Sequence, residues 1–155
     1  GGVIGGLNVV FNVEEDRGFL KSNAIAIIVT LGAVFALALA GTAISLAAAL
    51  PGAAAPVASF GLMFLVGMLG AGFLYRFAPN RPDPPWSAVL PGAAIFAFVW
   101  VGATALFGSY VANFANYNAT YGSLGAVVIL LTWFYLSAFV LLLGGEFVQA
   151  RAERN

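Results

Sequence analysis

The chain has 155 residues, of which 62% are hydrophobic and only 8% are charged, with six basic and six acidic side chains. Soluble domains carry about 25% charged residues, so this composition excludes a soluble globular domain and indicates that lipid surrounds most of the chain. Cysteine and histidine are both absent, which excludes disulfides, thiolate nucleophiles, imidazole bases and the usual zinc ligands. We therefore expect no catalytic, metal or cofactor site.

The first 23 residues are rich in glycine and end in a cluster of charged residues. Ile4, Leu7, Val10 and Phe11 recur at helical spacing, which predicts a short amphipathic helix at the membrane interface. The frayed end of a preceding element is the alternative, and the residues alone leave both open. Because the chain begins with glycine rather than methionine, we expect it to be a piece of a longer protein.

Four membrane spans are predicted after this segment, because one span needs about 20 apolar residues. Long runs at 24–50, 51–75 and 84–145 contain no Asp, Glu, Lys or Arg, and prolines or polar residues divide them. Small residues in the first span predict close helix packing; they are Gly32, Ala36, Ala40, Ala43 and Ala47. The expected fold is an all-α polytopic membrane domain over 1–155, with spans near 23–50, 57–77, 88–108 and 123–145.

The basic residues fall on one side of this four-span arrangement. The N-terminal segment, the loop 76–86 and the C-terminal end hold all six Lys and Arg, and the two opposite connections hold none. Positive charges near span ends mark the cytoplasmic side of a membrane. We therefore expect both ends of this piece to be cytoplasmic; the basic residues are Arg17, Lys21, Arg76, Arg81, Arg151 and Arg154.

The uncharged polar stretch 109–122 is predicted to form an interfacial helix on the opposite, external side. Its aromatic residues recur at i, i+4, i+7 and i+11 and so share one face of that helix, with amides and a hydroxyl beside them. An aromatic belt that anchors the helix is one interpretation. The other is that the polar groups bind a lipid headgroup or another polar solute. The aromatic residues are Tyr110, Phe114, Tyr117 and Tyr121, and the polar ones are Asn113, Asn116 and Thr120.

Glu146 is the acidic residue attached most directly to a span. Ionisable groups inside spans are functional candidates by default, but Glu146 lies about three residues beyond the expected apolar end at Leu143, roughly 4.5 Å along a helix axis. It is therefore either a structural partner of Arg76 or Arg81 or a substrate contact. The two arginines themselves either attract anionic lipid headgroups or act only as topology determinants, and Asp83 either caps the third span or pairs with one of them.

Two tryptophans, Trp100 and Trp133, each lie about ten residues into antiparallel spans, which places both near the middle of the membrane. Their indole N–H groups need hydrogen-bond partners there. Thr104 and Thr132 are the expected local partners.

Four motifs occur in the second half of the chain: LYRFAPNR at 74–81, LPGA at 90–93, YNATYGSLGA at 117–126 and LGGE at 143–146. Residues 7–8 and 15–19 fit the same pattern more loosely. In this order and spacing the chain resembles the YihY/virulence factor BrkB family over nearly its whole length. The resemblance implies a bacterial inner-membrane protein of about six spans, of which this chain holds the last four.

The resemblance implies less about function than about fold. Some members carried the label ribonuclease BN, an assignment since regarded as mistaken, and a role in moving lipids or other envelope molecules has been proposed. We expect a non-enzymatic transporter or export component, with a membrane scaffold or partner-binding subunit as the alternative. Expected partners are membrane lipids and a second copy or another membrane protein, but not nucleic acid. Candidate contacts for substrate or lipid are Asn113, Asn116, Tyr117, Asn118, Tyr121, Glu146, Arg76 and Arg81.

Overall fold

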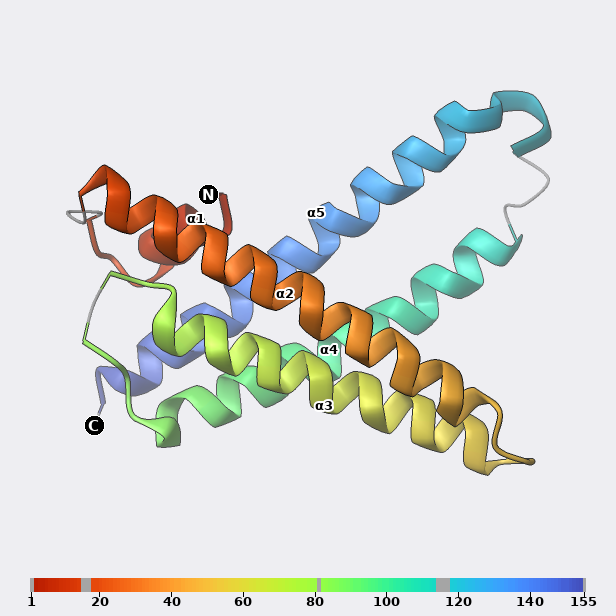
Figure 1. Cartoon of the computed structure of the whole chain (residues 1–155), viewed down its shortest axis with the longest axis horizontal. Coiled ribbons are helices and arrows are strands. Elements are labelled where there is room, and N and C mark those ends of the chain that lie inside the picture. Colours follow the sequence, from red (N-terminus) through yellow and green to blue (C-terminus); the bar gives the residue numbers. More distant parts are fainter. Residues whose placement is uncertain (1, 15–17, 81, 114–117, 155) are drawn as a thin grey trace.

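The computed structural model describes residues 2–14, 18–80, 82–113 and 118–154, and these fold into helices without a strand (Figure 1). The side chains of 113 and 118–123 also lie outside the description. Four helices are long and apolar enough to cross a membrane, which confirms the predicted all-α, four-span fold. In chain order the helices are α1 (Gly2–Val10), α2 (Phe19–Ala48), α3 (Ala54–Phe77), α4 (Trp86–Asn113) and α5 (Asn118–Ala152).

Prolines and one glycine set the ends of the central helices. Pro51 follows the last turn of α2, and Gly52 has a φ of 61°, a backbone conformation that glycine adopts without steric cost. The next helix, α3, ends two residues before Pro79. The carbonyl of Pro85 accepts hydrogen bonds from the amides of Ala88 and Val89 at 2.9 and 3.2 Å, so α4 begins earlier than predicted.

The predicted interfacial helix over 109–122 is not a separate element among the described residues. Instead, α4 continues to Asn113 and α5 begins at Asn118, so Tyr110 and Tyr121 belong to different helices rather than to one aromatic face. The physical reason is that Gly108 and Gly122, which flank the predicted helix, do not end the spans but lie inside α4 and α5. A single glycine costs a helix only about 1 kcal/mol relative to alanine.

Neighbouring helices in the chain pack side by side, α2 against α3, α3 against α4 and α4 against α5, while α1 packs against α5. Both termini and the α3–α4 connection lie at one end of the bundle (Figure 1), as the alternation of four spans predicts. We call this the charged end, because every described charged residue lies in or near it, and the other the uncharged end. The N-terminal helix is confirmed, and its Ile4 and Leu7 are buried.

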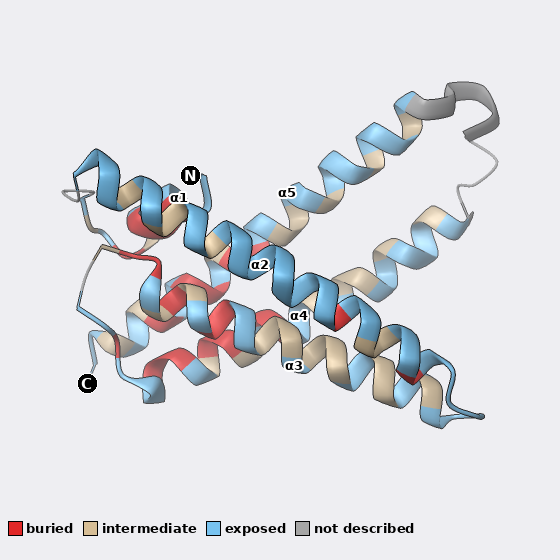
Figure 2. Ribbon diagram, viewed as in Figure 1, coloured by how far each residue is buried: buried red, intermediate tan, exposed pale blue. Residues whose placement is uncertain are grey.

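The packed core of the bundle lies at the charged end, as Figure 2 shows. No described residue in 98–112 or 124–139 is buried, and α2 is mostly exposed along its length (Figure 2). Of the small residues predicted to pack on α2, only Ala40 and Ala47 are buried. The largest fully buried side chains are those of Tyr75, Phe11, Leu7, Val89 and Val148.

Two glycines allow α4 and α5 to cross in backbone contact within this core. A Cβ at Gly92 would overlap the Val148 side chain and lie 2.9 Å from the carbonyl oxygen of Gly144. A Cβ at Gly144 would overlap the Tyr75 hydroxyl and lie 3.2 Å from the carbonyl oxygen of Gly92. Small residues permit this approach, which is how helices pack in lipid without a hydrophobic driving force between them.

Gly144→Ala is expected to destabilise the bundle, because the added methyl group has no space between Tyr75 and Gly92. Overpacking of this kind costs about 1–3 kcal/mol. Gly102→Ala on α4 is the matched control, because a Cβ there meets nothing within 4 Å and alanine favours a helix by about 1 kcal/mol over glycine. Unfolding in mixed micelles measures both free energies, and equal stability of the two variants would contradict the close crossing.

Candidate functional site

Tyr75 is the polar side chain at the centre of the packed end. It is fully buried, and its hydroxyl donates a hydrogen bond to the Leu141 carbonyl oxygen at 2.7 Å. A buried phenol needs such a partner, especially where lipid rather than water surrounds the bundle. Tyr75 therefore joins α3 to α5, two helices that are not consecutive in the chain.

Asn8 joins the first helix to the α3–α4 connection. Its buried side-chain oxygen Oδ1 accepts a hydrogen bond from the backbone N–H of Asn80 at 2.9 Å. The Asn80 side chain in turn donates from Nδ2 to the Glu14 carbonyl oxygen at 2.8 Å. These two bonds connect segments that lie about 70 residues apart in the sequence.

The C-terminal turn of α1 holds Asn8 in place for this contact. The amide of Val13 bonds the Asn8 carbonyl at 2.9 Å, and the amide of Asn12 bonds the Val9 carbonyl at 3.0 Å. Asn12 has a φ of 50°, a left-handed conformation that asparagine tolerates better than most residues. This pair of bonds is the Schellman arrangement that ends a helix.

Arg76 organises the loop between α3 and α4. Its Nη1 donates to the Pro84 carbonyl oxygen at 2.5 Å, and its Nη2 lies 3.6 Å from Oδ2 of Asp83. The guanidinium also lies 4.7 Å from the Trp86 ring centroid, within the range of a cation–π contact. The predicted pairing of Asp83 with an arginine is therefore confirmed for Arg76, although an ion pair this exposed contributes little to stability.

Glu146 lies on α5 with an exposed side chain. The predicted pair with Arg76 is not found, because that guanidinium contacts Asp83 and Pro84 instead. Arg81 lies outside the described residues, so its pairing with Glu146 stays a prediction. Within the described part of the chain, no three acidic side chains are grouped as metal ligands would be.

The candidates at the uncharged end are only partly described. Asn113 is the last residue of α4 and Asn118 the first of α5, and Tyr121 lies in the first turn of α5. Asn116 and Tyr117 lie outside the described residues. Binding by these five side chains therefore stays a prediction.

The hydrogen-bond partner of Trp100 differs from the one predicted. The indole Nε1 of Trp100 donates to the Ser137 hydroxyl of α5 at 3.1 Å. The hydroxyls of Thr104 and Thr132 instead bond carbonyls of their own helices, four residues earlier. Threonine in a helix commonly does this. The Trp100 indole, through its bond to Ser137, bridges α4 and α5. The Trp133 ring lies 5.9 Å from that of Trp100, centroid to centroid.

Residues from separate motifs meet at the charged end. Tyr75, Arg76 and Asn80 of the first motif, Gly92 of the second and Gly144 of the last all take part in the contacts described above. We define the sealed junction as Asn8, Tyr75, Asn80, Gly92 and Gly144. Of these five residues, none was a predicted site residue, although an asparagine and a tyrosine within apolar stretches are a recognisable signal for buried hydrogen bonds.

The fold and this junction are those of a polytopic α-helical membrane protein. Residues 1–155 match the family model described as virulence factor BrkB, and the chain belongs to that family. This confirms the resemblance of the motifs.

Of the relatives with curated names, one is called ribonuclease-like and others are called membrane proteins. The chain is 36% identical to the ribonuclease-like protein YfkH of Bacillus subtilis, over 93% of this chain and 57% of that protein. It is 28% identical to a UPF0761 membrane protein of Pseudoalteromonas translucida, over 96% of this chain and 52% of the relative. The chain thus spans about half the length of these relatives. No solved structure matches the chain.

Asn8→Leu is expected to release α1 from the charged end, because leucine has a similar size but cannot accept the Asn80 hydrogen bond. Loss of a buried acceptor costs roughly 1–3 kcal/mol. Hydrogen exchange of the Asn80 amide and protease cleavage after residue 10 should both accelerate. Asn23→Leu, at an exposed position of α2, is the control and should change neither rate; unchanged exchange in Asn8→Leu would contradict the link.

Proposed function

We propose that the whole protein moves, or helps to move, a lipid or another amphipathic envelope molecule in the bacterial inner membrane. The observation that carries this proposal is the asymmetric packing of the bundle, sealed at the charged end and divergent at the uncharged end. The α2–α3 hairpin and the α4–α5 hairpin separate toward the uncharged end (Figure 1). Their separated parts expose large apolar side chains, among them Leu46, Val57, Phe98, Leu106 and Leu130.

Apolar walls favour an amphipathic cargo over a small polar one. A lipid chain lies between such helices without loss of hydration, whereas a polar solute needs compensating hydrogen bonds. The four spans contain few groups for a proton relay, because 24–75 and 84–145 lack acidic and basic residues altogether. Movement of a lipid along open helix faces is therefore better supported than proton-coupled uptake of a solute.

We further propose that the charged end is cytoplasmic and that the uncharged end faces outward. The described basic residues lie near that end; they are Lys21, Arg76, Arg151 and Arg154. In the sequence, Arg17 belongs to the same N-terminal segment as Lys21, and Arg81 belongs to the same loop, 76–86, as Arg76. The positive-inside rule assigns such an end to the cytoplasm. In this orientation the seal formed by Tyr75 and Asn8 blocks the cytoplasmic side, and the bundle is open outward.

A scaffold that binds a partner protein without transport is the second candidate function. The exposed face of α2 favours it, because that face is available to another membrane protein. Crosslinking in native membranes separates the two functions: a stoichiometric protein partner supports a scaffold, and lipid trapped between spans supports transport.

A ribonuclease is poorly supported by the chemistry of this chain. Metal-assisted cleavage of RNA uses clustered carboxylate or histidine ligands, and the sequence has no histidine. The Asp83 carboxylate lies 3.6 Å from Arg76, and equal numbers of acidic and basic residues give the chain no net positive charge to attract RNA. Nuclease activity that survives purification and disappears in Glu14, Asp83 or Glu146 variants would overturn this view.

Reporter fusions test the orientation. Alkaline phosphatase fused after Ala54 or Asn116 of the full-length protein is expected to be active, because both sites connect spans at the uncharged end. Fusion after Arg154 is expected to be inactive in the same cells, with a cytoplasmic fluorescent reporter giving the reverse pattern. Phosphatase activity only at Arg154 would invert the orientation.

Reconstitution tests transport. The purified full-length protein in liposomes is expected to accelerate the movement of fluorescent phospholipid between leaflets relative to protein-free liposomes. If Glu146 contacts the cargo, Glu146→Gln lowers the rate at unchanged protein abundance, whereas a structural role lowers abundance instead. Failure to move any lipid class, together with unchanged envelope lipids in a deletion strain, would contradict the proposed function.

A further inference from the structure

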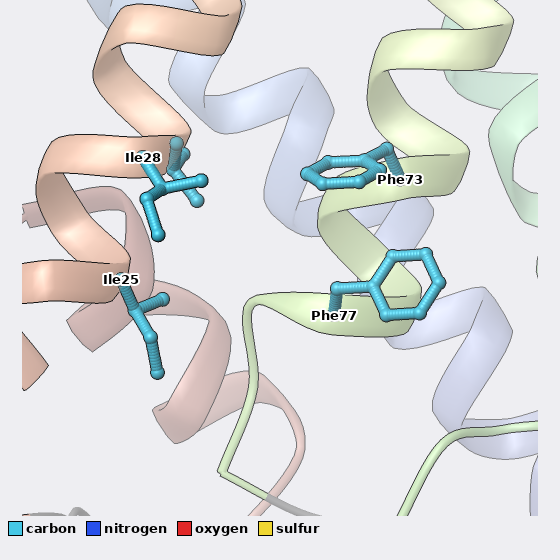
Figure 3. Close-up of a pocket in the computed structure, with 5 residues that line it drawn as sticks. Ile25, Ile28, Phe73 and Phe77 are labelled. Carbon is cyan, nitrogen blue, oxygen red and sulfur yellow. The ribbon is translucent and has the colours of Figure 1, made fainter. Parts of the chain in front are cut away.

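An apolar groove runs between α2 and α3 at the charged end (Figure 3). Ile25, Ile28 and Val29 form its wall on α2, and Phe73 and Phe77 form its wall on α3. The groove has a volume of about 290 Å³, slightly below the range of about 300–1,000 Å³ for sites that enclose drug-sized ligands. It is therefore large enough for part of one hydrocarbon chain but too small for a whole lipid.

Positive charge is placed where the groove ends. Lys21 precedes Ile25 by four residues and Ile28 by seven, so all three lie on the same face of α2. On α3, the Arg76 guanidinium lies 5.5 Å from the centroid of the Phe77 ring. Because Arg76 also faces the Asp83 carboxylate, Lys21 is the stronger source of positive charge for a bound ligand.

The composition of the walls distinguishes a lipid chain from another helix. Close packing of a helix against a groove in lipid depends on small residues, and all five wall residues are β-branched or aromatic. Both Phe73 and Ile28 remain substantially exposed, at 49% and 65%. A flexible chain fills such an irregular surface, and its anionic headgroup complements a lysine at the membrane boundary.

We propose that this groove binds one acyl chain of an anionic glycerophospholipid, whose phosphate lies against Lys21. The Lys21 ammonium donates hydrogen bonds to the phosphate oxygens, and Arg76 adds a weaker attraction from the α3 side. The chain then lies along Ile25 and Phe77 toward Ile28 and Phe73. This site deepens the proposed function, on which it rests for lipid as the class of ligand, and it adds a preference for negative headgroups.

Photolabelling of the full-length protein tests the site. The label is phosphatidylglycerol with a photoactivatable group in one acyl chain, present at low abundance in phosphatidylcholine vesicles. Adducts are expected on residues 25–29 and 73–77, with competition by unlabelled phosphatidylglycerol but not by further phosphatidylcholine. Lys21→Gln should lower this labelling about fivefold, the effect of one basic residue near an anionic lipid, and Lys21→Arg should retain it.

A pair of matched variants tests the groove itself. Ile28→Trp fills the groove and should reduce labelling by a similar factor. Val34→Trp is the control, because Val34 lies on the opposite face of α2 by helical periodicity and is 60% exposed. Unfolding midpoints in detergent show whether each variant is folded.

Several results would overturn the site. Equal labelling around α2, equal labelling by a phosphatidylcholine analogue, or unchanged labelling in folded Lys21→Gln and Ile28→Trp would each show contact with bulk lipid only. Failure of the site and failure of the proposed function are separable. Specific labelling without lipid movement in liposomes contradicts transport but supports the binding site. Lipid movement without specific labelling supports transport but contradicts the binding site.

Discussion

The contact between Gly92 and Gly144 is the constraint on which the rest of the bundle depends. It brings the backbones of α4 and α5 together, and only then can the Tyr75 hydroxyl reach the Leu141 carbonyl at 2.7 Å. The next residue, Gly145, gives α1 space on the far side of α5, because a Cβ there would lie 3.2 Å from Val10. Two adjacent glycines thus allow α1, α3 and α4 to pack around one point of α5. A larger residue at either position would keep these helices apart, and the charged end would not close.

Closure at the charged end follows from the side chains that meet there. Near the charged end, alanines and glycines such as Ala71, Gly72 and Ala93 let helices approach, and asparagine and tyrosine supply hydrogen bonds between them. Toward the uncharged end, α4 and α5 expose large apolar residues such as Leu106 and Leu130, for which lipid is as good a solvent as another helix. A membrane bundle can therefore stay open over half its length without exposing polar backbone, since every helix satisfies its own hydrogen bonds.

The sequence was sufficient to predict the four spans and the end at which the charges gather, because both depend on local composition. It was not sufficient to predict the sealed junction. The partners Asn8 and Asn80 lie 72 residues apart, and no periodicity connects them. Local reasoning also assigned Thr104 to the Trp100 indole, whereas Ser137 of another helix accepts that bond. Prolines were the more reliable signal, because they mark the α2–α3 and α3–α4 connections, whereas the single glycines Gly108 and Gly122 lie inside α4 and α5.

The peripheral position of α2 has a consequence for the order in which the bundle is assembled. Chains are synthesised from the N-terminus, so α2 enters the membrane before α3, the span against which it mainly packs. Its 30 residues contain one charge, that of Lys21 near the start, so the helix is stable in lipid before α3 is made. The partners of Tyr75 and Gly92 both belong to α5, the last of these five helices to be made. Among these five helices, the packed charged end is therefore complete only when α5 has been made.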